Sequence, residues 1–162
     1  MLTVYFLISL FVCIVCLASL GLLRKRMQPL LLLHGYFAGT ALMQQSFTVI
    51  SLNLHYVRPA LTWQSFWSVK LPGLFCMPVL LLWALLLLLS DKYHPGGKIA
   101  LVAAVLLLMT SVDVGINKAG FIEALHWNVL YSLIRYVMIL LVLWGYLTLL
   151  RSRMRKEGVA GL

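Results

Sequence analysis

The sequence has few charged residues and very few acids. Only 10% of its 162 residues are charged, and just 4 of them are Asp or Glu. Soluble domains are about a quarter charged. In contrast, 63% of this chain is hydrophobic, and the polar gaps between its apolar runs are all short. This composition excludes a separate soluble domain and predicts one membrane domain over residues 1–162.

Cysteine is also scarce, and the N-terminal run has no basic residue. The three cysteines, Cys13, Cys16 and Cys76, lie within apolar runs with no adjacent charge that would activate a thiol, which predicts inert, buried side chains. Residues 1–23 contain no Lys or Arg, whereas a secretory signal peptide begins with a positively charged segment. The first apolar run is therefore predicted to be a membrane span.

Five apolar runs are long enough to cross a bilayer, which takes about 20 helical residues. They predict an all-α, polytopic integral membrane bundle of five transmembrane helices, at approximately 2–23, 29–52, 69–90, 98–117 and 127–150. A separate interfacial helix is predicted over 59–68, because Trp63, Phe66 and Trp67 share one side of it. Pro78 should kink the third span and free a backbone carbonyl. The leucine-rich run 80–89 that follows is predicted to face lipid.

The net charge of +9 comes from basic clusters that flank the apolar runs. If the N-terminus is outside, nine Lys and Arg residues fall in cytoplasmic segments and three fall outside. This bias predicts an outside N-terminus and a cytoplasmic C-terminus, in a multi-pass protein of a cell membrane, and we expect a bacterial cytoplasmic membrane. Because topology accounts for the basic residues, the lipid bilayer is the expected partner and nucleic acid is not.

The second span carries small and polar residues at helical spacing. Gly35 and Gly39 form a G-x-x-x-G pattern, which permits close approach of another helix. That helix would belong either to the same chain or to a second copy or another membrane subunit. His34, Ala38, Ala41, Gln45 and Thr48 fall on one face, which we expect to point into the bundle.

Two charges lie where the bilayer should be, Asp113 in the fourth span and Arg135 in the fifth. Such charges normally face a partner or a water-filled cavity. In the predicted topology both lie in the outer half of antiparallel neighbours, so we expect them to pair. We also expect Arg135→Ala to destabilise the protein more than Asp113→Asn, because it leaves a carboxylate unpaired. The predicted polar seam comprises Gln44, Gln45, Thr110, Asp113, Asn117, Asn128, Tyr131 and Arg135.

This seam permits two interpretations, polar contacts that specify helix pairing or a cavity that binds a small polar or anionic ligand. The sequence favours a non-enzymatic membrane protein, either a small permease with an outward-facing polar seam or an accessory subunit of a larger complex. The alternatives are a haem- or quinone-binding redox protein and an intramembrane enzyme acting on lipid-linked substrates. No cofactor is predicted. His55, Glu123 and His126 are weak candidates for a metal site, since they lack the close spacing of typical ligands.

One short stretch resembles a known enzyme family. Residues 51–56 resemble part of the prolipoprotein signal peptidases, and Asn128–Val129 is similar to part of their second catalytic motif. That family uses two intramembrane aspartates. Tyr131 stands at the position of the second, and Asp113 is the only intramembrane acid. One carboxylate cannot perform the paired chemistry of an aspartyl dyad, so no catalytic residue and no family are assigned.

Overall fold

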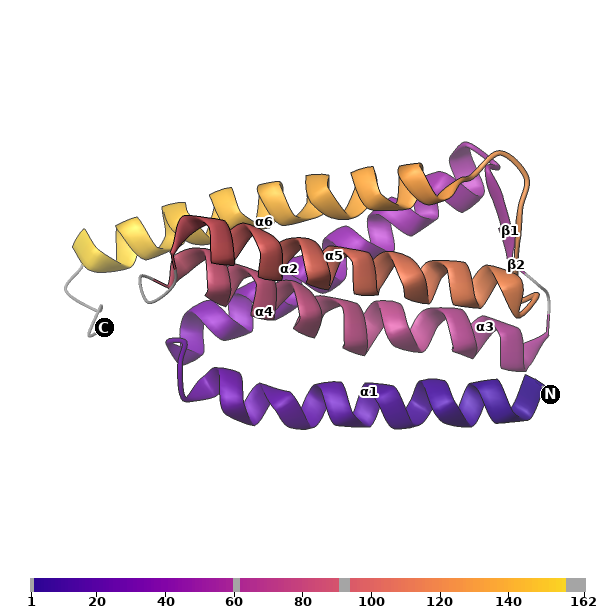
Figure 1. Cartoon of the computed structure of the whole chain (residues 1–162), viewed down its shortest axis with the longest axis horizontal. Helices are drawn as coiled ribbons and strands as arrows, with labels where there is room; N and C mark the ends of the chain where they lie inside the picture. Colours follow the sequence, from indigo (N-terminus) through magenta and orange to yellow (C-terminus); the bar gives the residue numbers. More distant parts are fainter. Residues whose placement is uncertain (1, 60–61, 91–93, 157–162) are drawn as a thin grey trace.

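The computed structural model of the chain describes residues 2–59, 62–90 and 94–156 and consists almost entirely of helices (Figure 1). In chain order the elements are α1 (Leu2–Arg24), α2 (Pro29–Thr48), the π-helical turn η1 (Val49–Asn53), β1 (Val57–Pro59), α3 (Trp63–Leu71), the π-helical turn η2 (Pro72–Cys76), α4 (Met77–Leu89), α5 (Pro95–Lys118), β2 (Ile122–Ala124) and α6 (Val129–Lys156).

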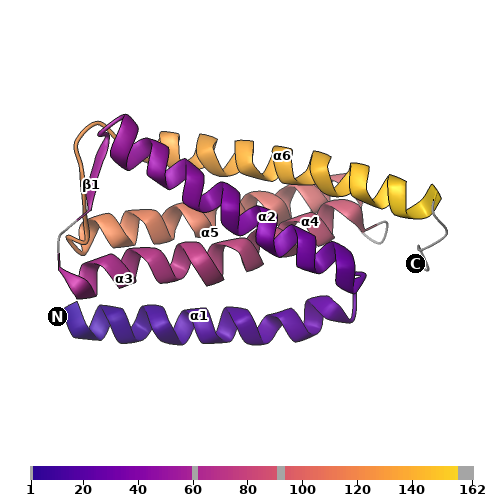
Figure 2. The same ribbon diagram turned by 180° about the vertical axis from the view of Figure 1, so that it is seen from behind.

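The helices make five passes along the long axis, α1, α2, α3–α4, α5 and α6, each antiparallel to the one before (Figures 1 and 2). Four of these are long and apolar enough to span a membrane, Thr3–Arg24, Trp63–Leu89, Pro95–Lys118 and Val129–Lys156. The helix α2 is long enough but less apolar, since it contains His34, Gln44 and Gln45. The chain is thus an all-α membrane bundle, as the sequence predicts.

The predicted surface helix is not a separate element. Ala60 and Leu61 lie outside the described residues, and the helix that begins at Trp63 continues without a break through η2 into α4. Thr62 accepts the N-terminal cap bond from the backbone N–H of Ser65. The third pass therefore begins at Trp63, six residues earlier than the predicted span 69–90.

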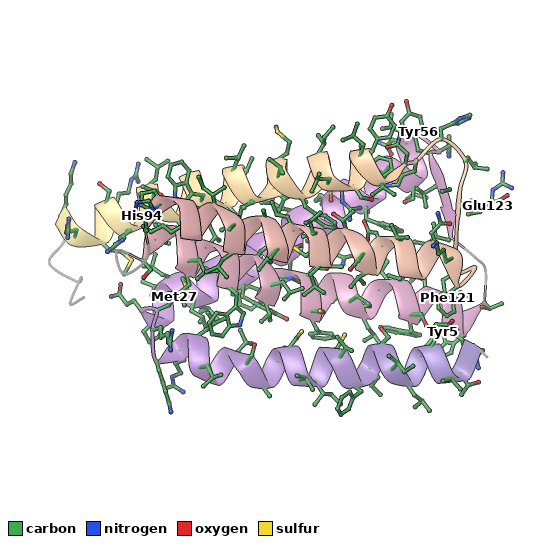
Figure 3. The ribbon with its side chains drawn as sticks, viewed as in Figure 1. Tyr5, Met27, Tyr56, His94, Phe121 and Glu123 are labelled. Carbon is green, nitrogen blue, oxygen red and sulfur yellow. The ribbon has the colours of Figure 1, made fainter. Side chains whose placement is uncertain are left out.

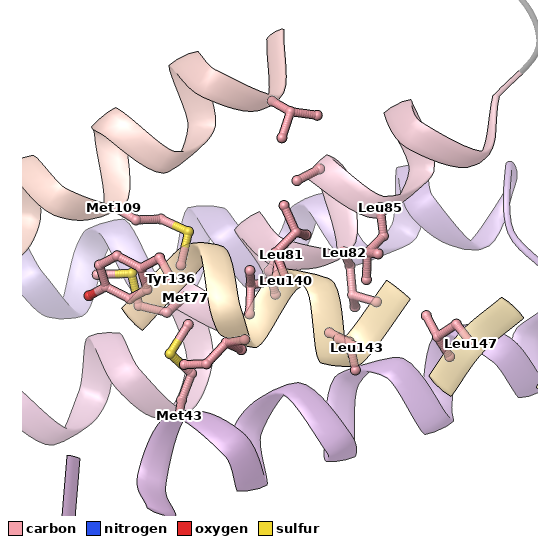
Figure 4. Close-up of a cluster of buried hydrophobic side chains, with 14 of the residues drawn as sticks. Met43, Met77, Leu81, Leu82, Leu85, Met109, Tyr136, Leu140, Leu143 and Leu147 are labelled. Atoms are coloured by element: carbon pink, nitrogen blue, oxygen red, sulfur yellow. The ribbon is translucent and has the colours of Figure 1, made fainter. Parts of the chain in front are cut away.

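The helix α4 lies at the centre of the bundle and packs against α1, α2, α5 and α6. The prediction that its leucine run faces lipid was wrong, because Leu81, Leu82 and Leu85 are fully buried. Figure 4 shows this cluster, with Leu143 and Leu147 of α6 at one end and Tyr136 beside Met77 and Met109 at the other. A helix that is apolar all round fits such a central position as well as it fits lipid.

The helix α2 buries its glycine face. Leu31, Gly35, Gly39 and Met43 are buried. Of the face predicted to point inward, His34, Ala41 and Gln45 are exposed, and only Ala38 and Thr48 are partly buried. A Cβ atom on Gly35 would lie 2.7 Å from Leu82 Cδ2. The close approach that these glycines permit is therefore made within the chain, to α4 and α6.

Pro78 has the expected effect on the backbone. Proline lacks the N–H that would bond the carbonyl four residues earlier, which is that of Leu74. The hydroxyl of Tyr36 donates a hydrogen bond to this carbonyl at 3.1 Å. The π-helical turn η2 immediately precedes the proline, and a hydroxyl of α2 satisfies the group that the proline leaves unbonded.

At the other end of the bundle from the basic C-terminus of α6, a two-stranded antiparallel ribbon joins the two connections (Figure 1). Its register pairs Val57 with Ala124 and Arg58 with Glu123. Figure 3 shows the side chain of Glu123 pointing away from the helices. Neither strand was predicted, because a three-residue strand has too few positions to show an alternating pattern.

Candidate functional site

The two intramembrane charges meet. Arg135 Nη2 donates a hydrogen bond to Asp113 Oδ2 at 3.1 Å, with side chains that are 14% and 25% exposed, respectively. Asp113 is in the last two turns of α5, and Arg135 is in the second turn of α6. Their antiparallel packing brings these turns to the same level, as the sequence predicts.

The pair lines a cavity of about 340 Å³ at the ribbon end of the bundle. Its walls come from α2, η1, α3, η2, α4, α5 and α6, and the ribbon contributes Val57, Ile122 and Ala124. The alternation along β2 explains this arrangement, since Ile122 and Ala124 face the cavity and Glu123 points outward, where it lies 4.0 Å from Arg58. The ribbon thus presents an apolar face to the cavity.

A second cation, Lys70 of α3, borders the same cavity. Its Nζ donates a hydrogen bond to Gln44 Oε1 at 2.9 Å and lies 5.2 Å from the centre of the Phe47 ring. Both partners are neutral. Among the described residues Lys70 makes no ion pair, so its positive charge in the cavity wall is not balanced by a carboxylate.

Arg135 is only partly bonded. One of its nitrogens contacts Asp113, the guanidinium lies 4.5 Å from the centre of the Tyr136 ring, and the buried Nε has no hydrogen-bond partner. The fully buried Tyr136 also interacts with both members of the ion pair. An arginine can donate five hydrogen bonds, so this one retains donors for a further acceptor.

The cavity wall contains three cations and one carboxylate. Lys118, the last residue of α5, also lines it, together with Lys70, Arg135 and Asp113. The rest of the wall is largely apolar and aromatic, with Phe47 and Trp127 among its members. Trp127 is held in place by a hydrogen bond from its Nε1 to Ser132 Oγ at 2.8 Å.

The structure places five of the eight predicted seam residues in the cavity wall, Gln44, Asp113, Asn117, Asn128 and Arg135. The other three do not line it. Thr110 is buried and donates to the carbonyl of Leu106, Gln45 is exposed on the outer face of α2, and Tyr131 is exposed and packs on Trp127. Asn128 also accepts a hydrogen bond from the backbone N–H of Tyr131.

Sequence reasoning missed Lys70, Lys118, Trp127, Ser132 and Tyr136 as cavity residues. Two signals were available. Ser132 and Tyr136 fall on the same face of α6 as Asn128, at spacings of four residues. Lys70 lies eight residues, or about two helical turns, before Pro78 and falls within the predicted span 69–90, so it could have been considered together with the polar seam.

The weak metal candidates do not form a site. His126 packs on Tyr56, Glu123 faces Arg58, and His55 has a left-handed backbone conformation, with a φ of 52°. Within residues 2–59, 62–90 and 94–156, no three His, Cys, Asp or Glu side chains come together as metal ligands would. His34 is also apart from these residues, with its Nδ1 3.0 Å from the Tyr146 hydroxyl.

No family model matches this chain, and no curated protein or solved structure is significantly similar to it. Function must therefore be inferred from the cavity itself.

Proposed function

We propose that this protein is a small, non-enzymatic permease that binds an anionic ligand in the cavity at the ribbon end of its bundle. One observation carries the proposal: three cations and a single carboxylate line one largely apolar cavity. Lys70 is partly buried and the Arg135 side chain is 14% exposed, and charges in such a wall are costly unless something compensates them. An anionic ligand in the cavity would compensate them.

The cavity also suits a transported solute by its position. The basic clusters at Arg24–Arg26 and in the last turns of α6 lie at the opposite end of the bundle (Figure 1). If these clusters are cytoplasmic, as the bias of basic residues favours, the cavity opens toward the outside. A binding site at one end of a bundle whose central helix is interrupted by a π-helical turn is a reasonable starting state for alternating access.

The two apolar surfaces that favoured an accessory subunit in the sequence are both buried within this chain. The G-x-x-x-G face of α2 packs against Leu82, Leu143 and Leu147 of the same chain. The leucine run of α4 is likewise buried inside the bundle. Neither surface is free to bind another subunit.

Anion binding is tested by thermal unfolding of the purified protein in mild detergent, with benzoate, phenyl phosphate or inorganic phosphate. We expect at least one anion to raise the Tm of the wild type, and a matched organic cation, trimethylphenylammonium, to leave it unchanged. Arg135→Gln should abolish the shift, whereas Arg58→Gln, on the outer side of the ribbon, should retain it. Uptake of the stabilising anion into proteoliposomes then separates a permease from a binding protein. An unchanged Tm with all three anions would contradict the proposal.

A further inference from the structure

The charges in the cavity wall do not balance. Lys70, Lys118 and Arg135 supply three positive charges and Asp113 supplies one negative charge, which leaves an excess of two (3 − 1 = 2). The other acidic side chain that the structure describes, Glu123, points away from the cavity and faces Arg58. The neighbours that contact Lys70 and the free side of Arg135, namely Gln44, Phe47 and Tyr136, are all neutral at ordinary pH.

An occupant of matching charge would carry two negative charges. A monoanion would compensate only one of the two excess positive charges of the wall. A dianion would compensate both excess charges. Complementary charge of this kind governs specificity more than total affinity. Arg135 lines the cavity, and a planar guanidinium is suited to the two adjacent oxygens of a phosphate or carboxylate group.

The rest of the lining indicates an apolar body on the same ligand. Phe47, Ile50, Val57, Met77 and Trp127 form much of the wall. A volume of about 340 Å³ is near the lower end of the roughly 300–1,000 Å³ typical of ligand pockets, so the body is the size of a small ring or short chain. An inorganic dianion would leave these side chains in contact with water alone.

We propose that the ligand of this cavity is an organic dianion with a compact apolar body, of the phosphomonoester or dicarboxylate type. The inference rests on the proposed anion-binding function and narrows it. Two sources supply this chemistry, a soluble metabolite and the headgroup of a lipid with a terminal phosphate.

The experiment measures the shift in Tm that each of three probes produces in the wild-type protein. The pH is about 8, roughly two units above the second pKa of a phosphate ester, so that phenyl phosphate is a dianion. Phenyl phosphate is a dianion with a ring, benzoate is a monoanion with the same ring, and inorganic phosphate is a dianion without one. We expect phenyl phosphate to bind at least roughly tenfold more tightly than either of the others. Equal affinity for phenyl phosphate and benzoate overturns the charge argument, and equal affinity for phenyl phosphate and inorganic phosphate overturns the apolar body.

Lys118→Met provides the matched variant, because Lys118 is exposed at the end of α5 and is remote from the leucine core. It should reduce the preference for phenyl phosphate over benzoate by several-fold while benzoate binding changes less. An unchanged preference overturns the inference. Binding of benzoate alone, by contrast, leaves the proposed function standing, and absence of binding by any probe removes both.

The source is tested in lipid nanodiscs of phosphatidylcholine with and without phosphatidic acid. If the lipid headgroup occupies the cavity, phosphatidic acid should raise the Tm and eliminate the response to phenyl phosphate, and Lys118→Met should weaken both effects. If the ligand is soluble, phosphatidic acid should leave the phenyl phosphate response intact.

Discussion

The two ends of this bundle are built from the same five passes, yet one end is closed and the other contains a cavity. At the closed end, Gly35 lets Leu82 and Leu147 pack directly against the backbone of α2. At the ribbon end, Gln44 and Phe47 of α2 face Lys70 instead. The difference shows that the contacts between the helices are set locally by the size and polarity of their side chains. Five substitutions, at four places in the bundle, probe this difference.

The largest loss of stability is expected at the centre of the closed end. Leu82→Ala removes a fully buried side chain from between α2 and α6 and should lower the free energy of unfolding by about 2–5 kcal/mol. Leu107→Ala is the control, because Leu107 is 60% exposed on the outer face of α5 and should have little effect. Unfolding in mixed detergent micelles measures both, and similar losses for the two variants would contradict the assignment of the core to α4.

The next largest effect is expected at the ion pair. Asp113→Asn leaves three cations around one cavity without a carboxylate and should cost about 1–3 kcal/mol in the absence of ligand. Arg135→Ala should cost less, because Asp113 then retains two lysines in the same wall and can also take up a proton. This order reverses the one that the sequence alone favours. Added phenyl phosphate should restore stability to Asp113→Asn and not to Arg135→Ala; the opposite pattern would exclude Arg135 as the anion ligand.

A smaller loss is expected from a methyl group at the close helix contact. Gly35→Ala places a Cβ 2.7 Å from Leu82 Cδ2 and 3.2 Å from Leu147 Cδ1, so both must shift, at a net cost of about 1–2 kcal/mol. Gly145→Ala on α6 is the matched control, since nothing lies within 4 Å of its added Cβ. It should be neutral or slightly stabilising, and a comparable loss there would argue against a tight α2–α4 contact.

The smallest effect concerns the carbonyl that Pro78 leaves unbonded. Tyr36→Phe removes the donor to the Leu74 carbonyl and should cost about 1 kcal/mol. In a Pro78→Ala background the restored N–H can bond this carbonyl, so the same substitution should cost less. A double-mutant cycle measures the coupling, and a coupling energy of zero would show that the hydroxyl does not compensate for the proline.

Much of the fold could be predicted from the sequence, because the bilayer restricts the choices. Runs of apolar residues predicted five helical passes, and Pro78 predicted an unbonded carbonyl. The depth of Asp113 and Arg135 on antiparallel neighbours predicted their pairing. Each of these follows from length, backbone chemistry or the cost of charge in hydrocarbon, which depend little on details of packing.

The faces of the helices could not be predicted as well. In α2 the rule that polar residues point inward failed, since the buried face is set by the four-residue spacing of Leu31, Gly35, Gly39 and Met43. In α4 the run is apolar on every side and has no preferred face. The place of Lys70 in the cavity wall was not predicted, because its partners, Gln44 and Phe47, come from a helix distant in the sequence. Such contacts depend on packing between elements, which a single sequence does not specify.

The central claim, that an anion-binding cavity is reached from the outer end, is tested most directly by thiol labelling in sealed, right-side-out vesicles. Asn117→Cys, at an exposed position of the cavity wall, is introduced after Cys13, Cys16 and Cys76 are replaced by serine. We predict that a membrane-impermeant maleimide labels it from outside and that phenyl phosphate slows the labelling, while Leu107→Cys in the same background stays unlabelled. Labelling of Asn117→Cys only in inverted vesicles, or at a rate that phenyl phosphate does not change, would contradict the account.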